Sequence, residues 1–197
     1  MTYEIVSALI TFAFVSSVTP GPNNLMLLAS GVNFGVVRSL PHMIGISTGF
    51  VLMSLILGLG LVQLFDRYPS IHLALKILSV AYMLWLAWKI ANASAPKTEN
   101  SGAKPLSIWQ AAAFQWVNPK AWAMATTALT VYAPTGDFRT VAMVSVIFGC
   151  VNFPTISFWV ILGQNFRKVL SNPRNLRVFN ITMALLLVAS LWPILRA

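Results

Sequence analysis

A chain of 197 residues in which 57% of the side chains are hydrophobic and only 9% are charged is not a soluble domain, where about a quarter of residues are charged. Its mean hydropathy of +0.76 predicts an integral membrane protein embedded in a lipid bilayer. The net charge of +9 does not indicate nucleic-acid binding, because the basic residues lie singly or in pairs between apolar runs. The single cysteine, Cys150, excludes an intramolecular disulfide, and neither a metal site nor a cofactor is expected.

The first apolar segment, at about 5–31, is interrupted in its middle by a run of prolines and asparagines. A proline lacks a backbone N–H, clashes with the carbonyl group four residues earlier and pushes the preceding residue out of the α region. In lipid, unpaired backbone groups cost several kcal/mol each, so such a break must be buried in protein or line a wet cavity. The sequence therefore predicts a substrate site near the membrane midplane that includes Pro20, Gly21, Pro22, Asn23 and Asn24.

Further apolar segments predict spans at about 41–64, 71–91, 107–133, 140–164 and 178–195. The most polar stretch, residues 92–105, is interpreted as a linker between two halves. The sequence thus predicts an all-α membrane protein with six transmembrane helices in one transporter domain. Its two inverted three-helix repeats would cover about 1–91 and 106–197.

Lysine and arginine are distributed unequally between the two sides of the predicted spans. Loops after the first, third and fifth spans hold Arg38, Lys89, Lys97, Lys104, Arg167, Lys168, Arg174 and Arg177, whereas the opposite side holds Arg67, Lys76, Arg139 and Arg196. Loops rich in basic residues remain in the cytoplasm. Both termini are therefore predicted to lie outside the cell inner membrane, and the two halves would insert with opposite orientations.

The fourth span resembles the first because it is also interrupted. Asn118-Pro119 aligns with Thr19-Pro20, and Lys120 is the only charged residue deep within a predicted span. Inverted repeats whose first helices are broken at mid-depth are typical of secondary transporters that bind substrate at the breaks. We therefore expect Asn118, Pro119 and Lys120 to share one substrate site with the first break.

Four motifs occur in order along the chain: Thr19-Pro20-Gly21-Pro22-Asn23-Asn24, Gly45-Ile46-Ser47-Thr48-Gly49, Ala81-Tyr82-Met83-Leu84-Trp85-Leu86-Ala87-Trp88-Lys89 and Asn118-Pro119-Lys120. They resemble the motifs of the lysine exporter and homoserine/threonine exporter family of small amino-acid efflux proteins. Within that family, the first motif and the stretch 86–91 are most similar to the branch assigned cysteine and O-acetylserine efflux. Many relatives carry an acidic residue where this chain has Phe50, so a carboxylate-based proton or cation site is not expected there.

The expected role of Lys120 has two alternatives. A lysine near the bilayer centre costs about 2.5–3.5 kcal/mol, and no carboxylate is expected at its depth. Its partner would be an amino-acid carboxylate or, if the lysine is structural, carbonyl groups freed by Pro119. Likewise, Asn23, Asn24 and Asn118 would either orient a zwitterion or cap the half-helices after each break. Carbonyl groups that end the preceding half-helices would receive the ammonium group of the substrate.

Two further residues are candidates for the site. Asn152, close to Pro154 in the fifth span, would line the cavity at a second kink, and the Tyr82 hydroxyl would donate inward unless its ring only packs. Gly45 and Gly49 form a face of small residues that favours close helix packing, and this face would also allow a homo-oligomer.

These features predict a secondary transporter, not an enzyme, that exports a small neutral amino acid or derivative by alternating access. The resemblance implies a substrate of the cysteine/O-acetylserine or homoserine/threonine type. The coupling stays open between proton antiport, with Lys120 as the carrier, and facilitated diffusion. The alternative function is a pore-forming or assembly subunit of a membrane complex. A membrane enzyme would need a nucleophile with its base, paired carboxylates or metal ligands at depth, and none is evident.

Overall fold

The structure is a computed structural model that describes residues 1–61, 69–92, 104–167, 170 and 172–191, and over these residues it contains helices and no strands. In chain order the helices are α1 (Tyr3–Val18), α2 (Pro22–Ile56), the short π-helix η1 (Leu57–Leu61), α4 (Pro69–Ala91), α5 (Ile108–Gln115), α6 (Pro119–Tyr132), α7 (Phe138–Phe166) and α8 (Pro173–Ala189). The predicted all-α class is confirmed. Most of the predicted linker and the loop that holds Arg67 lie outside the described residues.

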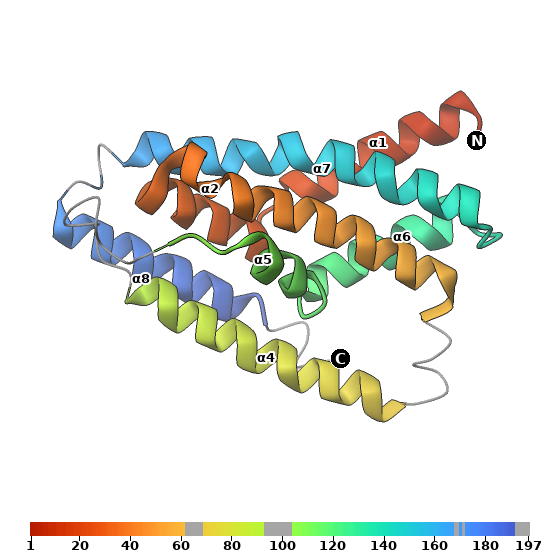
Figure 1. The fold of residues 1–197 in the computed structure, drawn as a ribbon. Helices are drawn as coiled ribbons and strands as arrows, with labels where there is room; N and C mark the ends of the chain where they lie inside the picture. The colour runs from red at the N-terminus through yellow and green to blue at the C-terminus, as the bar shows by residue number, and fades with distance from the viewer. Residues whose placement is uncertain (62–68, 93–103, 168–169, 171, 192–197) are drawn as a thin grey trace.

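The helices form an elongated bundle (Figure 1). In this view α1 and α7 lie along the upper edge, α4 and α8 pack side by side along the lower edge, and α2 runs between them. Both predicted breaks are confirmed, because α1 ends at Val18 before α2 begins at Pro22, and α5 ends at Gln115 before α6 begins at Pro119.

α2 consists of two helical segments that meet at Gly35. Gly35 has φ 77° and ψ 174°, a conformation that glycine adopts readily because it has no Cβ. The segments fold back on each other, since the hydroxyl oxygens of Ser30 and Ser39 lie 2.7 Å apart across the turn. The Gln164 side-chain oxygen in α7 accepts a hydrogen bond from the Val36 N–H at 2.7 Å, which satisfies a donor left free at the start of the second segment.

Two predicted boundaries are wrong. The second predicted span began at about residue 41, but the helix starts directly after Gly35, and Pro41 and Arg38 lie within it. The sixth predicted span began at about residue 178, whereas α8 begins at Pro173. Its start is set by Asn172, whose side chain accepts a hydrogen bond from the Arg174 N–H at 2.9 Å, so basic residues expected in a loop occupy the first turns of α8.

Glycines let α2 and α7 approach each other closely at the centre of the bundle. A Cβ added to Gly31 would lie 2.1 Å from the carbonyl oxygen of Val160, and one added to Gly163 would lie 2.1 Å from that of Leu28. Both contacts are between backbones, so no side chain can move aside to relieve them.

We expect Gly163→Ala to lower the thermal stability of the purified protein in detergent. Overpacking of this kind costs about 1–3 kcal/mol, and here the methyl group would meet the rigid backbone of α2. Val146→Ala, in the same helix, is the control, because the Val146 side chain lies on the exposed surface of the bundle. Equal melting temperatures for the two variants would contradict the close α2–α7 packing.

Gly45 and Gly49 have the packing role predicted for them. A Cβ added to Gly45 would lie 2.4 Å from the carbonyl oxygen of Ile108, and one added to Gly49 would lie 2.4 Å from the Cα of Ala112. The second segment of α2 therefore holds α5 in place, and with it the second break.

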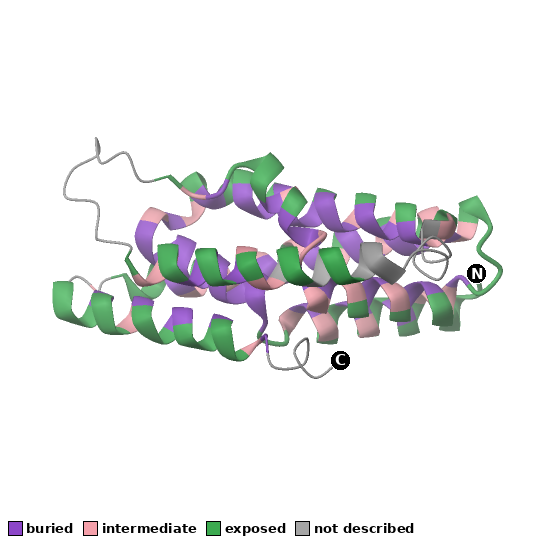
Figure 2. Cartoon of the chain, turned by 90° about the horizontal axis from the view of Figure 1, so that it is seen from below, coloured by how far each residue is buried: buried purple, intermediate pink, exposed green. Residues whose placement is uncertain are grey.

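The outer surface of the bundle is apolar. Figure 2 shows exposed residues on the outward sides of the helices and buried ones where helices face each other. The exposed side chains include Phe14, Val37, Val146, Phe158 and Leu185, as expected for a surface that contacts lipid. The stretches Pro22–Gly60 and Phe138–Phe166 are long and apolar enough to span a membrane, and Tyr3–Val18 and Val80–Ala91 are shorter apolar helices.

Candidate functional site

The two helix breaks are distant in sequence but contact each other inside the bundle. Lys120, in the first turn of α6, donates hydrogen bonds from its Nζ to the carbonyl oxygen of Thr19 and, at 3.5 Å, to that of Pro20. Asn23 and Gln115 form a reciprocal amide pair, with distances of 2.9 Å from Asn23 Nδ2 to Gln115 Oε1 and 3.3 Å from Gln115 Nε2 to Asn23 Oδ1. These contacts join both breaks into one polar site.

The first break is held by the side chain of Asn24. Thr19 has φ −59° and ψ 132°, the extended conformation favoured before a proline, and α1 therefore stops. The Asn24 Nδ2 group donates to the carbonyl oxygens of Ser17 and Thr19 at 2.9 and 2.8 Å, which pairs acceptors that a helix end leaves free. Asn24 thus caps the end of α1, which corrects the expectation that it would cap the start of the following helix.

Gly21 leaves room for the side chain of Lys120. Its φ of −171° and ψ of 179° are extended values that any residue adopts. A Cβ at this position would lie 2.6 Å from Cδ of Lys120 and 3.1 Å from its Nζ. The aliphatic part of Lys120 therefore passes directly over Gly21 on its way to the carbonyl groups of the first break.

The second break is built by Asn118 and Pro119. The Asn118 side-chain oxygen accepts a hydrogen bond from the Lys120 N–H at 3.2 Å, so Asn118 is the N-cap of α6. Pro119 occupies the first helical position, where its missing N–H has no intrahelical acceptor to lose. The capping alternative for Asn118 is therefore confirmed.

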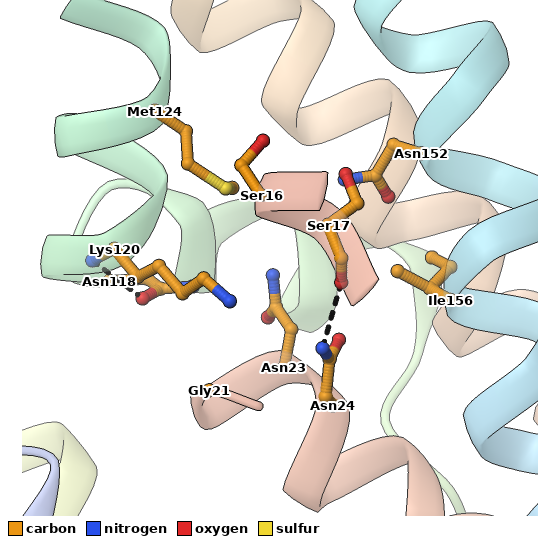
Figure 3. Close-up of a pocket in the computed structure, with 10 residues that line it drawn as sticks. All are labelled: Ser16, Ser17, Gly21, Asn23, Asn24, Asn118, Lys120, Met124, Asn152 and Ile156. Carbon is orange, nitrogen blue, oxygen red and sulfur yellow. Dashed lines mark hydrogen bonds between the residues drawn. The ribbon is translucent and has the colours of Figure 1, made fainter. Parts of the chain in front are cut away.

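A small cavity lies between α1, α2, α6 and α7 (Figure 3). It is lined by Ser16, Ser17, Gly21, Asn23, Asn24, Asn118, Lys120, Met124, Asn152 and Ile156. Its free space is about that of one water molecule. An organic solute would therefore need the surrounding helices or side chains to move apart.

Asn152, which lines this cavity, has an unpaired acceptor. Its Nδ2 group donates to the Ser17 hydroxyl oxygen at 3.3 Å. Its Oδ1 atom is buried and has no hydrogen-bond partner within the described part of the chain. A buried amide oxygen without a donor costs about 1–3 kcal/mol, so this atom would favour a solute that brings an N–H, O–H or S–H group.

The Lys120 ammonium group is held by backbone carbonyl oxygens and not by a carboxylate of the described residues. Among the residues that the structure describes, the carboxylates are Glu4 and Asp137, both exposed and both at helix starts. The Thr135 hydroxyl and the Thr140 N–H donate to the Asp137 carboxylate at 2.7 and 3.0 Å and lower its pKa to about 2. Asp137 is therefore ionised, and it caps the start of α7.

Most of the residues predicted for the site surround the cavity. Gly21, Asn23, Asn24, Asn118, Lys120 and Asn152 line it, whereas Pro20, Pro22 and Pro119 border the two breaks without lining it. Tyr82 is elsewhere, in α4, where its ring packs against Trp85 and Phe114 with centroid distances of 5.4 and 5.6 Å. Tyr82 therefore does not line the cavity.

Sequence reasoning missed several residues of the site. Ser16, Ser17 and Gln115 are polar residues that directly precede the breaks within apolar runs, and that position was a usable signal. Met124 and Ile156 also line the cavity. They carry no such signal, because apolar residues fill every span of this chain.

Comparison with known proteins gives the family. The model of the LysE type translocator family matches residues 14–190, a region that contains every residue lining the cavity. The chain belongs to the LysE type translocator family. The resemblance found in the sequence is therefore confirmed, and as a LysE type translocator the protein is a membrane transport protein and not an enzyme.

Curated relatives of this LysE type translocator are similar to it along nearly their whole length. The cysteine/O-acetylserine efflux protein of Klebsiella pneumoniae is 33% identical over 174 residues, which cover 86% of this chain and 87% of the relative. The proteins of the same name from Escherichia coli K12 and Shigella sonnei are each 34% identical over 191 residues, which cover 95% of this chain and 96% of the relative. No solved structure gives a significant match.

Proposed function

We propose that this LysE type translocator exports a small neutral amino acid, of the cysteine or O-acetylserine type, across the inner membrane. The observation that carries the proposal is the contact between two helix breaks around a cavity that holds one lysine and several amides. The relatives named for cysteine and O-acetylserine efflux support this substrate class, because the similarity to those of Escherichia coli K12 and Shigella sonnei covers 95% of the chain and so includes both breaks.

The groups in the cavity are suited to a zwitterion with a short side chain. The Lys120 ammonium group is the charged group of the cavity and would pair with a carboxylate. Carbonyl groups at the end of α1 would accept hydrogen bonds from an ammonium group, since a helix C-terminus carries negative partial charge. The apolar side chains of Met124 and Ile156 would pack against a neutral side chain.

We further propose six spans in two inverted repeats that move relative to each other. The first repeat would comprise α1 with α2 and α4, and the second α5 with α6, α7 and α8. In both, a helix broken at a proline precedes a long helix and a final helix, the pattern of transporters with midplane sites. Alternating access would open the cavity between the two breaks to one side of the membrane at a time.

Topology can be tested with single cysteines in a Cys150→Ala background. We expect Thr2→Cys to react with an impermeant thiol reagent in intact cells, because the N-terminus is predicted to lie outside. Lys104→Cys, on the basic side, should react only after the membrane is permeabilised. Both positions are exposed, so reaction of Lys104→Cys in intact cells would show that the assignment is wrong.

Transport itself can be tested with purified protein in liposomes. Labelled cysteine should enter vesicles preloaded with unlabelled cysteine or O-acetylserine faster than empty ones, and the rate should saturate. Flux without saturation or exchange would instead identify a pore, and absence of cysteine flux would contradict the substrate class. An imposed pH gradient in the same vesicles separates proton antiport from facilitated diffusion.

A further inference from the structure

The Lys120 ammonium group occupies the position expected for the ammonium group of a substrate. It donates to the carbonyl oxygens of Thr19 and Pro20, which follow the last turn of α1. The negative partial charge at a helix C-terminus favours a cation there. In this conformation the protein supplies that cation from its own second break, and the cavity has room for about one water molecule.

The same ammonium group is also the natural partner for a carboxylate in the cavity. Among the residues that the structure describes, no other charged side chain lines it. A zwitterion whose ammonium group reaches the Thr19 and Pro20 carbonyl oxygens must therefore displace the lysine, and its carboxylate would then lie where the displaced lysine can pair with it.

We propose that Lys120 is a tethered substitute for the substrate ammonium group, held by the Thr19 and Pro20 carbonyls until an amino acid takes its place. The exchange replaces one ammonium group with another at the same acceptors. The carboxylate of the incoming amino acid then pairs with the released Lys120. This inference rests on the proposed function, since it requires a zwitterionic substrate.

The surroundings of Lys120 suit such an exchange. Its side chain passes over Gly21, where the absence of a Cβ leaves a path along the backbone. Asn24 also donates to the Thr19 carbonyl oxygen, at 2.8 Å, so this acceptor keeps one partner while the lysine moves. Asn152 lines the same cavity. Its buried Oδ1 atom has no partner among the described residues and would accept a hydrogen bond from the substrate once the site opens.

The exchange explains why both charges of a substrate would be needed. An amine without a carboxylate would displace Lys120 but leave two ammonium groups close together with no counter-ion. An acid without an amine would draw Lys120 away but leave the carbonyl groups of the first break without a cation. Removing Lys120 should therefore create a site for simple amines, an outcome that a purely structural lysine would not produce.

The test measures binding of three probes to the purified full-length protein under reducing conditions: cysteine, cysteamine, which lacks the carboxylate, and 3-mercaptopropionate, which lacks the amine. In the wild type, cysteine should bind at least about tenfold more tightly than either analogue. In Lys120→Met, the affinity for cysteine should fall by about tenfold or more, and the affinity for cysteamine should rise by about tenfold. Lys104→Met, which removes an exposed lysine outside the helices, should leave all three affinities unchanged.

Gly21→Ala provides a second test that keeps Lys120. Its Cβ would displace the lysine side chain from the carbonyl groups, and the extended backbone at this position accepts alanine. Cysteamine should bind more tightly than in the wild type, while cysteine binding is retained. If cysteamine gains affinity in neither variant although the wild type exchanges cysteine in liposomes, this inference is overturned and the proposed function stands. If the wild type does not transport cysteine, both fail.

Discussion

Replacing Pro20, Gly21 and Pro22 together with alanine should abolish transport while leaving the protein inserted in the membrane. A proline inside a helix costs about 3 kcal/mol relative to alanine, and glycine about 1 kcal/mol. Without them, α1 and the first segment of α2 can join into one helix. The carbonyl groups of residues 19 and 20 would then bond within that helix and no longer accept from Lys120.

Liposome exchange of cysteine measures the loss, and Pro173→Ala is the control. Pro173 also lies at the first position of a helix, α8, but it borders neither break. The Pro173→Ala variant should exchange cysteine at the wild-type rate. Normal exchange by a well-folded triple variant would show that the first break has no part in transport.

Lys120→Met should fold and insert but bind cysteine or O-acetylserine at least about tenfold more weakly. Insertion should become more favourable by about 2.5 kcal/mol or more, because a charged group no longer enters the hydrocarbon region. The affinity falls because the substrate carboxylate would be desolvated without a cationic partner. Direct binding to the purified protein, combined with its melting temperature, separates this loss from unfolding.

Lys120→Arg refines the interpretation. It keeps the charge but replaces a compact ammonium group with a broad planar guanidinium group, in a space bounded closely by Gly21. We expect intermediate transport. Undiminished affinity for cysteine in Lys120→Met would instead mean that Lys120 only satisfies the Thr19 and Pro20 carbonyls as a structural lysine.

Both breaks were predictable from the sequence because a proline interrupts a helix by local sterics alone. The partners of the side chains around them were not, since Asn24 pairs with carbonyls of the preceding helix and Asn23 pairs with Gln115. Such contacts depend on how distant segments pack.

Gly35 is a local signal for the turn that the predicted boundary at about residue 41 did not include. A proline at residue 41 is typical of a helix start, yet the chain turns at Gly35 and tolerates Pro41 inside the second segment of α2. For Tyr82 the structure favours the packing alternative, because its ring packs against Trp85 and Phe114. Neither outcome follows from composition, because both depend on tertiary packing.

The most direct test of the account asks whether an amino acid occupies the cavity between the two breaks. Met124 lines this cavity, so a Met124→Cys, Cys150→Ala protein carries one reporter there, and Thr135→Cys in the same background reports on an exposed position between α6 and α7. Provided that the Met124→Cys protein still transports, saturating O-acetylserine, which has no thiol, should slow maleimide labelling at position 124 and leave labelling at position 135 unchanged. An unchanged labelling rate at position 124 would place the amino acid elsewhere and contradict the account.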